Sequence, residues 1–316
     1  MVKYLLLIII SVAFTLALVA MSSLSATYYW LDLVTSFIPH LLMLSLGLSL
    51  ILIFIKPKLA TSIAVITFTT LLINIPITLS FNYYNDPSIT VSQLNLNYYN
   101  ADIEGVYNLL GTEGSDITAL FEVNDTDRTR FIALRGDYFD YGSAEIEGFP
   151  DGIGVITKFP ILQRITHSVF ENSVRGVIVE LHVAVGHQKL RIFALHPPSP
   201  RNQKLWHKRN MILLYLTNLL NQPHDIKHTL VLGDFNTGPL SQHFTRVERF
   251  NTCYQLAGHY ASWSPVKLPQ PLYSIFGLTI DHCLLSDSLL LDTLTTQYIP
   301  GSDHAMLKYN IVLPKQ

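Results

Sequence analysis

The residues whose types suit catalysis stand at the ends of short apolar runs along the chain. Carboxylate and amide oxygens could bind a hard metal ion, and an imidazole beside a carboxylate could transfer protons. Strand ends favour such chemistry because they hold side chains rigidly at the rim of a sheet. In chain order, the candidate residues are Asn95 with Asn100, Glu122, His196, Asp234 with Asn236, Asp281, and Asp303 with His304.

Each of these positions, taken alone, has a simpler explanation. An Asn after a strand is commonly a turn former, and a Glu there is commonly a solvated edge charge. His196 precedes two prolines, which is typical of a loop, and Ser302 could cap a helix. Six such segments in this order are better explained by one shared site.

The apolar pattern also predicts the elements that position these side chains. A hairpin around Gly186 joins two apolar runs. A long helix comes next, with Ser199 as its predicted cap and Pro200 in its first turn. We expect an α/β fold, a four-layer sandwich of two mixed sheets flanked by helices. The predicted strands are residues 90–96, 116–123, 152–157, 177–183, 189–195, 228–233, 279–285 and 308–313, and the predicted helices are 102–110 and 200–220.

This succession of segments resembles the endonuclease/exonuclease/phosphatase superfamily, over residues 88–313. The most specific motifs are Gly233-Asp234-Phe235-Asn236, Ile280-Asp281-His282 and Ser302-Asp303-His304, and residues 152–160 resemble a structural strand and turn of the family. His196 resembles the deoxyribonuclease and sphingomyelinase branches, since the abasic-site branch usually has a tyrosine there. Phe121 departs from the glutamine common before the metal-binding Glu, so we expect altered packing there.

The resemblance implies a phosphoesterase that uses Mg²⁺, with Mn²⁺ as a possible substitute. Asn95, Glu122 and Asp303 would surround the metal. Asp281 would orient His304 and raise its basicity, and either this pair or Asp234 could activate water. His196 would contact the phosphate or the leaving group. The remaining substrate contacts would come from Asn100 and from Asn236, which with Asp234 would also orient the nucleophile.

The charges divide the chain into two unlike parts. The whole chain is 49% hydrophobic and 14% charged, and residues 1–80 carry four formal charges, Lys3, Asp32, Lys56 and Lys58. The remainder holds 18 basic and 22 acidic residues. This mildly acidic part lacks the strong basic face that a large nucleic-acid footprint needs.

Three apolar stretches, residues 4–21, 38–55 and 59–79, are each about long enough to cross a bilayer. We predict an all-helical membrane anchor over 1–80, a linker over 81–87 and a catalytic domain over 88–316. The lysines at positions 3, 56 and 58 would lie on the cytoplasmic side. The catalytic domain would then face the periplasm or exterior of a bacterial inner membrane.

The natural substrates would be lipid head groups, nucleic acid or small phosphoesters, with the bilayer as a partner. The alternative is a catalytically silent binding module with the same fold. The apolar loop 262–277 could touch a membrane, although we favour internal packing for it. We interpret Cys253 and Cys283 as two small core residues, with a disulfide possible if the domain is extracytoplasmic.

Overall fold

The computed structural model describes residues 2–76, 88–144, 149–171, 173, 175–266 and 268–314. The chain forms two compact units. One comprises Met1–Thr78 and Thr237–Phe244, and the other comprises Leu79–Asn236 and Thr245–Gln316. The linker predicted over residues 81–87 lies outside the described residues.

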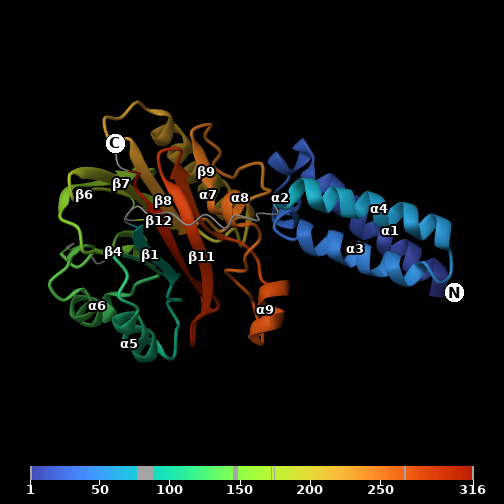
Figure 1. Ribbon diagram of the computed structural model, residues 1–316, viewed down its shortest axis with the longest axis horizontal. Helices are drawn as coiled ribbons and strands as arrows, with labels where there is room; N and C mark the ends of the chain where they lie inside the picture. Colours follow the sequence, from blue (N-terminus) through green and yellow to red (C-terminus); the bar gives the residue numbers. More distant parts are fainter. Residues whose placement is uncertain are drawn as a thin grey trace. The chain divides into compact units, whose positions relative to one another are not determined.

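The first unit is built on apolar helices, α1 (Val2–Met21), α2 (Tyr29–Thr35), α3 (Ile38–Leu52) and α4 (Pro57–Asn74). α3 packs against both α1 and α4 (Figure 1). By length and composition, α1 and α4 could each cross a membrane. Helices α2 and α3 are bent by 66° relative to each other and would make a third span if the pair is taken as one broken helix. Many outward side chains are apolar, including Leu5, Ile8 and Val12, as expected of a surface in contact with lipid.

The second unit contains two six-stranded sheets. In spatial order, the first sheet is β11 (Leu290–Tyr298), β12 (Ala305–Val312), β1 (Ser88–Asn95), β2 (Ile117–Phe121), β4 (Gly154–Thr157) and β3 (Phe139–Tyr141). The second sheet is β5 (Ile161–Ser168), β6 (Val177–Val185), β7 (Gln188–Leu195), β8 (His228–Asp234), β10 (Asp281–Ser286) and β9 (Phe250–Thr252).

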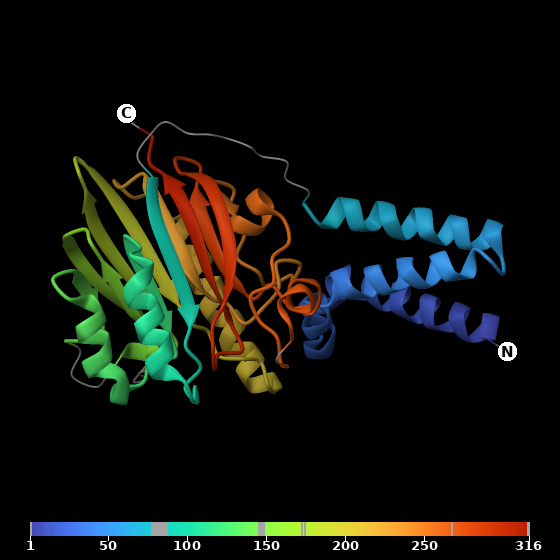
Figure 2. The same ribbon diagram turned by 60° about the horizontal axis from the view of Figure 1, so that its bottom comes forward.

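The two sheets share one apolar core. Val91 and Ala119 of the first sheet are buried in one cluster with Val179, Ile192 and Leu232 of the second. The remaining helices of this unit are α5 (Ile103–Glu113), α6 (Arg128–Arg135), α7 (Gln203–Asn221), α8 (Cys253–Ala257) and α9 (Gln270–Phe276). Helices α5 and α6 lie together beside the sheet that contains β1 and β4, as Figure 2 shows. With α7 packed over β6, the order is helix, sheet, sheet, helix, and the predicted α/β sandwich is confirmed.

Two parallel strand pairs decide where the candidate residues lie. β1 runs parallel to β2 with Asn95 beside Phe121, and β7 runs parallel to β8 with Leu195 beside Gly233. Glycine is needed at position 233 because a Cβ there would collide with the carbonyl oxygen of Leu195. The residues that follow these strand ends are therefore held by the sheets themselves.

The long helix begins later than the sequence predicts. α7 starts at Gln203, and its cap is Asn202, whose Oδ1 accepts a hydrogen bond from the amide of Leu205 at 3.0 Å. Ser199 and Pro200 lie before the helix instead. Asn is among the best capping residues, so the first helical turn forms three residues further on.

The two cysteines are core residues, as the sequence predicts, and they form the disulfide that the sequence left open. Cys253 and Cys283 form a disulfide, and both are fully buried. The pairing follows from strand register, because Thr252 of β9 lies opposite Leu284 of β10 and thereby brings the neighbouring cysteines together. Disulfides of this kind persist in oxidising compartments.

Candidate active site

The ends of four strands bring most of the predicted residues together. Asn95 is the last residue of β1 and Glu122 follows β2, while Asp234 ends β8 and Asp281 begins β10. Because β8 and β10 are antiparallel, Asp281 lies directly opposite Asp234. The two sheets thus each contribute carboxylates to one end of the sandwich.

Asn95 joins the residues from the two sheets. Its side-chain Nδ2 donates to Glu122 Oε1 at 3.2 Å and to Asp234 Oδ2 at 3.0 Å. His196 lies beside the same two acids, with Nε2 3.6 Å from Glu122 Oε1 and 3.8 Å from Asp234 Oδ2. Phe121 stands where the family commonly has glutamine. Its ring lies near the His196 ring, with 6.2 Å between the two centroids.

His304 lies between two carboxylates. Its Nδ1 bonds Asp281 Oδ2 at 2.9 Å, and its Nε2 lies 3.7 Å from Asp234 Oδ2. Burial alone would lower the pKa of His304, but Asp281 and Asp234 outweigh it and raise this pKa to about 10. Burial and the neighbouring Asp281 charge raise the pKa of Asp234 to about 6. All three groups are buried, so proton positions within this set are strongly linked.

Asn236 is held in place from two sides. Its amide donates to Asp234 Oδ1 at 2.9 Å, and its Nδ2 donates to the carbonyl of Pro197 at 3.0 Å. Arg209 of α7, which is 1% exposed, donates from Nη1 to the Asn236 carbonyl at 3.0 Å. Arg209 was not predicted, because its role depends on a backbone carbonyl that no sequence motif reveals.

Asp303 reaches the other residues through Asn97. Asn97 Nδ2 donates to Asp303 Oδ1 at 2.9 Å, and the Asn97 amide donates to Asn95 Oδ1 at 2.9 Å. The second Asp303 oxygen accepts from the indole of Trp263 at 2.8 Å. Asn97 and Trp263 are site residues that the sequence reasoning missed, although the spacing of Asn97 from Asn95 was an available signal.

Asn100 contacts a different set of groups. Its Nδ2 donates to the carbonyls of Leu96 and Pro300, and its Oδ1 accepts from the amide of Asp102. These bonds join the loop after β1 to the loop before Asp303. Substrate binding by Asn100 therefore stays a prediction.

The backbone takes an unusual conformation around the site. Among the described residues, the non-glycine positions with positive φ are Asn97 (63°), Glu122 (57°), Asp151 (53°) and Asn236 (52°). The Asp151 carbonyl lies 3.4 Å from His196 Nδ1, so all four lie at or beside the candidate residues. Each such conformation costs on the order of 1 kcal/mol or more, and such costs concentrate at functional sites.

Comparison with known proteins shows the family. The model of the Endonuclease/Exonuclease/phosphatase family matches residues 92–304, which is about two thirds of the chain and includes every candidate site residue named above. The chain belongs to this family. No curated protein sequence is similar enough to match the chain.

Solved structures of similar fold cover a similar share of this chain. D. rerio TDP2 complexed with single strand DNA product is 14% identical with a TM-score of 0.57, covering 72% of this chain and 99% of that one. A family protein from Bacteroides vulgatus is 14% identical with a TM-score of 0.59, covering 72% and 100%. The human Nocturnin catalytic domain with bound sulfate anion is 18% identical with a TM-score of 0.54, covering 72% and 96%. At these identities the likeness shows the fold alone.

The donor set of this family member fits a divalent cation. Glu122 and Asp303 carry carboxylate oxygens, the ligand type that hard cations prefer, whereas Asn95 turns its amide nitrogen toward Glu122 and its oxygen toward the Asn97 amide. Asp234, Asp281 and His304 form a second possible group, with one ligand atom of each within 4.8 Å of the others. Asp234 and Asp281 are both buried, and buried carboxylates need positive charge for compensation.

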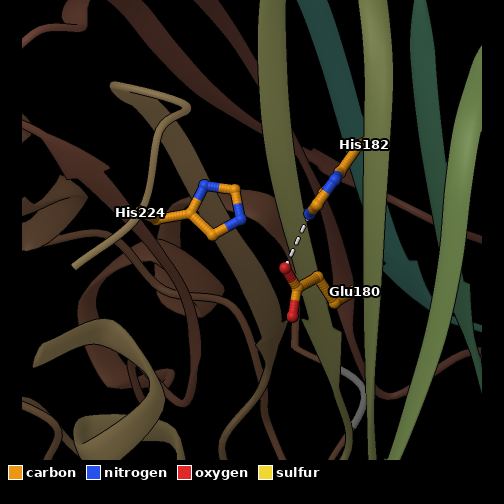
Figure 3. Close-up of side chains that lie close together, drawn as sticks. All are labelled: Glu180, His182 and His224. Carbon is orange, nitrogen blue, oxygen red and sulfur yellow. Dashed lines mark hydrogen bonds and ion pairs between the residues drawn. The ribbon is translucent and has the colours of Figure 1, made fainter. Parts of the chain in front are cut away.

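A second histidine and carboxylate group lies away from these residues. Figure 3 shows the Glu180 carboxylate bonded to the ring of His182, with the ring of His224 facing them. Glu180 also accepts from Arg191 at 2.5 Å and contacts His167 at 2.7 Å. The Arg191 cation already neutralises the carboxylate, so a buried ion-pair network explains this group better than a metal site does.

The apolar loop over residues 262–277 is divided between packing and exposure. Tyr273 is buried with Ala261 and Ala305, whereas Ile275 and Phe276 of α9 are exposed. Internal packing, which the sequence favoured, therefore accounts for only part of this loop.

Proposed function

We propose that the second unit hydrolyses phosphoester bonds with the help of a bound Mg²⁺. The observation that carries this proposal is the buried row Asp281, His304 and Asp234, next to Glu122 and Asn95. Family membership supports the reaction class. The row supplies groups that can move a proton, and Glu122 supplies an oxygen ligand for a cation.

The side chains would divide the reaction as follows. A bound Mg²⁺ would neutralise charge on the phosphate oxygens. Asp281 holds Nδ1 of His304, which leaves Nε2 as the atom that exchanges a proton near Asp234. Either Asp234 or His304 in its neutral form takes a proton from the attacking water. His196 and Asn236 would contact the phosphate, and the oxygen that leaves phosphorus takes up a proton as the P–O bond breaks.

We infer that the substrate is a lipid head group or a small phosphoester. The D. rerio TDP2 relative was solved with single strand DNA, so nucleic acid is a competing substrate class. The charged residues beyond position 80 are more often acidic than basic, which disfavours a strongly bound polyanion.

We also infer that this unit faces the outside of the cytoplasmic membrane. The apolar helices α1 and α4 support membrane anchoring, and the positions of Lys3, Lys56 and Lys58 support this orientation. The disulfide between Cys253 and Cys283 also supports an oxidising compartment.

The test is an activity panel with the purified full chain and Mg²⁺. It would cover bis(p-nitrophenyl) phosphate, a phosphatidylinositol phosphate, sphingomyelin and single-stranded DNA. We expect turnover of at least one non-nucleic-acid phosphoester, loss of that turnover with EDTA, and recovery with Mg²⁺ or Mn²⁺.

The variant Glu122→Gln removes one ligand charge while keeping the side-chain shape, and we expect it to lose at least about 10²-fold in turnover. Glu104→Gln, at an exposed carboxylate paired with Arg130, is the matched control. If the folded wild type cleaves nothing in the panel, the proposal is wrong and the silent binding module becomes the better interpretation.

A further inference from the structure

The segment directly after the Asp234-to-Asn236 motif is packed with the apolar helices. Residues Thr237–Phe244 belong to the same compact unit as α1 to α4. Asn236, the last residue of the other unit at this point, is bonded to Thr237 by an ordinary peptide bond. We call Thr237–Phe244 the site loop.

Polar groups of the helical region hold the site loop. Ser241 Oγ donates to Asp32 Oδ1 at 2.5 Å, and both residues are buried. The Gly238 amide donates to Ser36 Oγ at 3.0 Å. Nε2 of His243 lies 3.1 Å from the carbonyl oxygen of Ala26.

Packing also holds the site loop. Leu240 lies against the apolar cluster that includes Ala17, Ile38 and Leu42. A Cβ on Gly238 would lie 2.9 Å from Ser36 Oγ and 3.0 Å from Ser36 Cα, so this close approach requires glycine.

Asp32 is an unusual residue for its apolar surroundings. It is the one acidic residue among the first 80 and is 1% exposed. Burial of a carboxylate is costly unless hydrogen bonds compensate for the lost water. The bond from Ser241 provides such compensation and at the same time fixes the loop.

We propose that Asp32 is a positioning residue for catalysis, which acts through Ser241 and the site loop. Asn236 bonds Asp234 through its amide and side chain, so a displaced site loop would move Asn236 and loosen Asp234. Asp32 and Ser241 would then fix the start of the site loop and, through the peptide bond at Thr237, the position of Asn236. Misplacement of reacting groups by about 1 Å is enough to lower turnover strongly.

The test uses the full chain in lipid nanodiscs of phosphatidylcholine and phosphatidylglycerol. The variants are Asp32→Ala, Ser241→Ala, their combination and the conservative Asp32→Asn. Ser45→Ala is the matched control, because Ser45 is a buried hydroxyl of α3 whose side chain meets Thr67 of α4. The measurements are kcat and KM with bis(p-nitrophenyl) phosphate and Mg²⁺, together with hydrogen–deuterium exchange of peptides that span residues 235–245.

We expect Asp32→Ala and Ser241→Ala each to lower kcat on the order of tenfold to a hundredfold, the scale of one hydrogen bond to a charged group, while KM changes little. The double variant should be no worse than either single one, because both remove the same bond. Asp32→Asn keeps an acceptor oxygen and should recover most of the activity. Exchange in 235–245 should rise in the alanine variants and stay unchanged in Ser45→Ala.

The activity part of this inference rests on the proposed function, but the exchange part does not. If the wild type cleaves no phosphoester, the exchange of 235–245 still decides whether Asp32 holds the loop. Unchanged exchange in Asp32→Ala, or a kcat loss that Ser45→Ala reproduces, would overturn the inference.

Discussion

At the scale of single residues, the position of His304 defines the chemistry that the site can perform. Two carboxylates flank its ring, and only Asp281 is within direct hydrogen-bonding distance. In the proposed mechanism, Asp281 is the orienting partner, and Asp234 lies near the nitrogen that would exchange protons.

We expect His304 and Asp281 to act as one unit. His304→Ala should lower turnover by about 10³-fold or more, and Asp281→Asn somewhat less, because an amide can still hold the ring. The double variant should be little worse than His304→Ala, since units of this kind are strongly non-additive. Turnover of one soluble phosphoester at fixed Mg²⁺ measures all three. Losses that multiply in the double variant would instead favour Asp234 as the base.

The sequence could predict residues that end apolar runs, and it missed residues whose roles depend on contacts distant along the chain. Asn95, Glu122, Asp234 and Asp281 each stand at a strand end, where a polar residue is conspicuous. Trp263 contacts Asp303 across 40 positions, and Asn97 does so across 206. The Trp263 contact has no local sequence signal, and the one signal for Asn97 is its spacing from Asn95.

At the scale of elements, a buried ion-pair network joins β6 to its neighbours. Glu180 and His182 of β6 bond each other, and Glu180 also bonds Arg191 of β7 and His167 of β5. Burial alone would raise the pKa of Glu180, but the hydrogen bonds from His167, Arg191 and His182 outweigh it and hold this pKa well below its usual range.

Glu180→Gln should destabilise the fold by about 3 kcal/mol or more, because it leaves Arg191 buried without a carboxylate. A depressed carboxyl pKa contributes stability above the unfolded-state value, and that contribution falls as the pH drops below about 4.5. The wild type should therefore lose stability more steeply than the variant below that pH. Unfolding of the detergent-solubilised chain between pH 3 and 8 measures both effects. Glu104→Gln should change stability by less than about 1 kcal/mol. If Glu104→Gln destabilised the chain as much as Glu180→Gln does, burial would not explain the effect of Glu180.

Apolar runs predicted the central strands well, but the edge strands were missed. β5 and β11 lie at the outer ends of the two sheets, and most of their side chains are at least partly exposed. An edge strand needs few buried side chains, so its sequence lacks the apolar run that marks β2 or β8.

At the scale of the whole molecule, the lysines of the helical part determine the expected orientation. A reporter active only in the cytoplasm should be inactive when fused after Gln316. The same reporter inserted in the turn at Lys56-Pro57-Lys58 should be active and serves as the matched control. Strong cytoplasmic signal from the Gln316 fusion would reverse the orientation.

The division into an apolar part and a charged part follows directly from composition, because charge is nearly confined to residues beyond 80. Composition could not reveal that residues 237–244 pack with the helices. That packing depends on individual contacts, such as Ser241 to Asp32, between segments about two hundred positions apart.

The four non-glycine residues with positive φ oppose stability to activity when this chain is engineered for heat resistance. Asn97, Glu122, Asp151 and Asn236 hold a backbone conformation that glycine adopts more easily. A selection that rewards stability alone would accept glycine at these four positions and in doing so delete side chains around the candidate site. Improved variants should therefore be sought away from these residues, where added stability does not reduce activity.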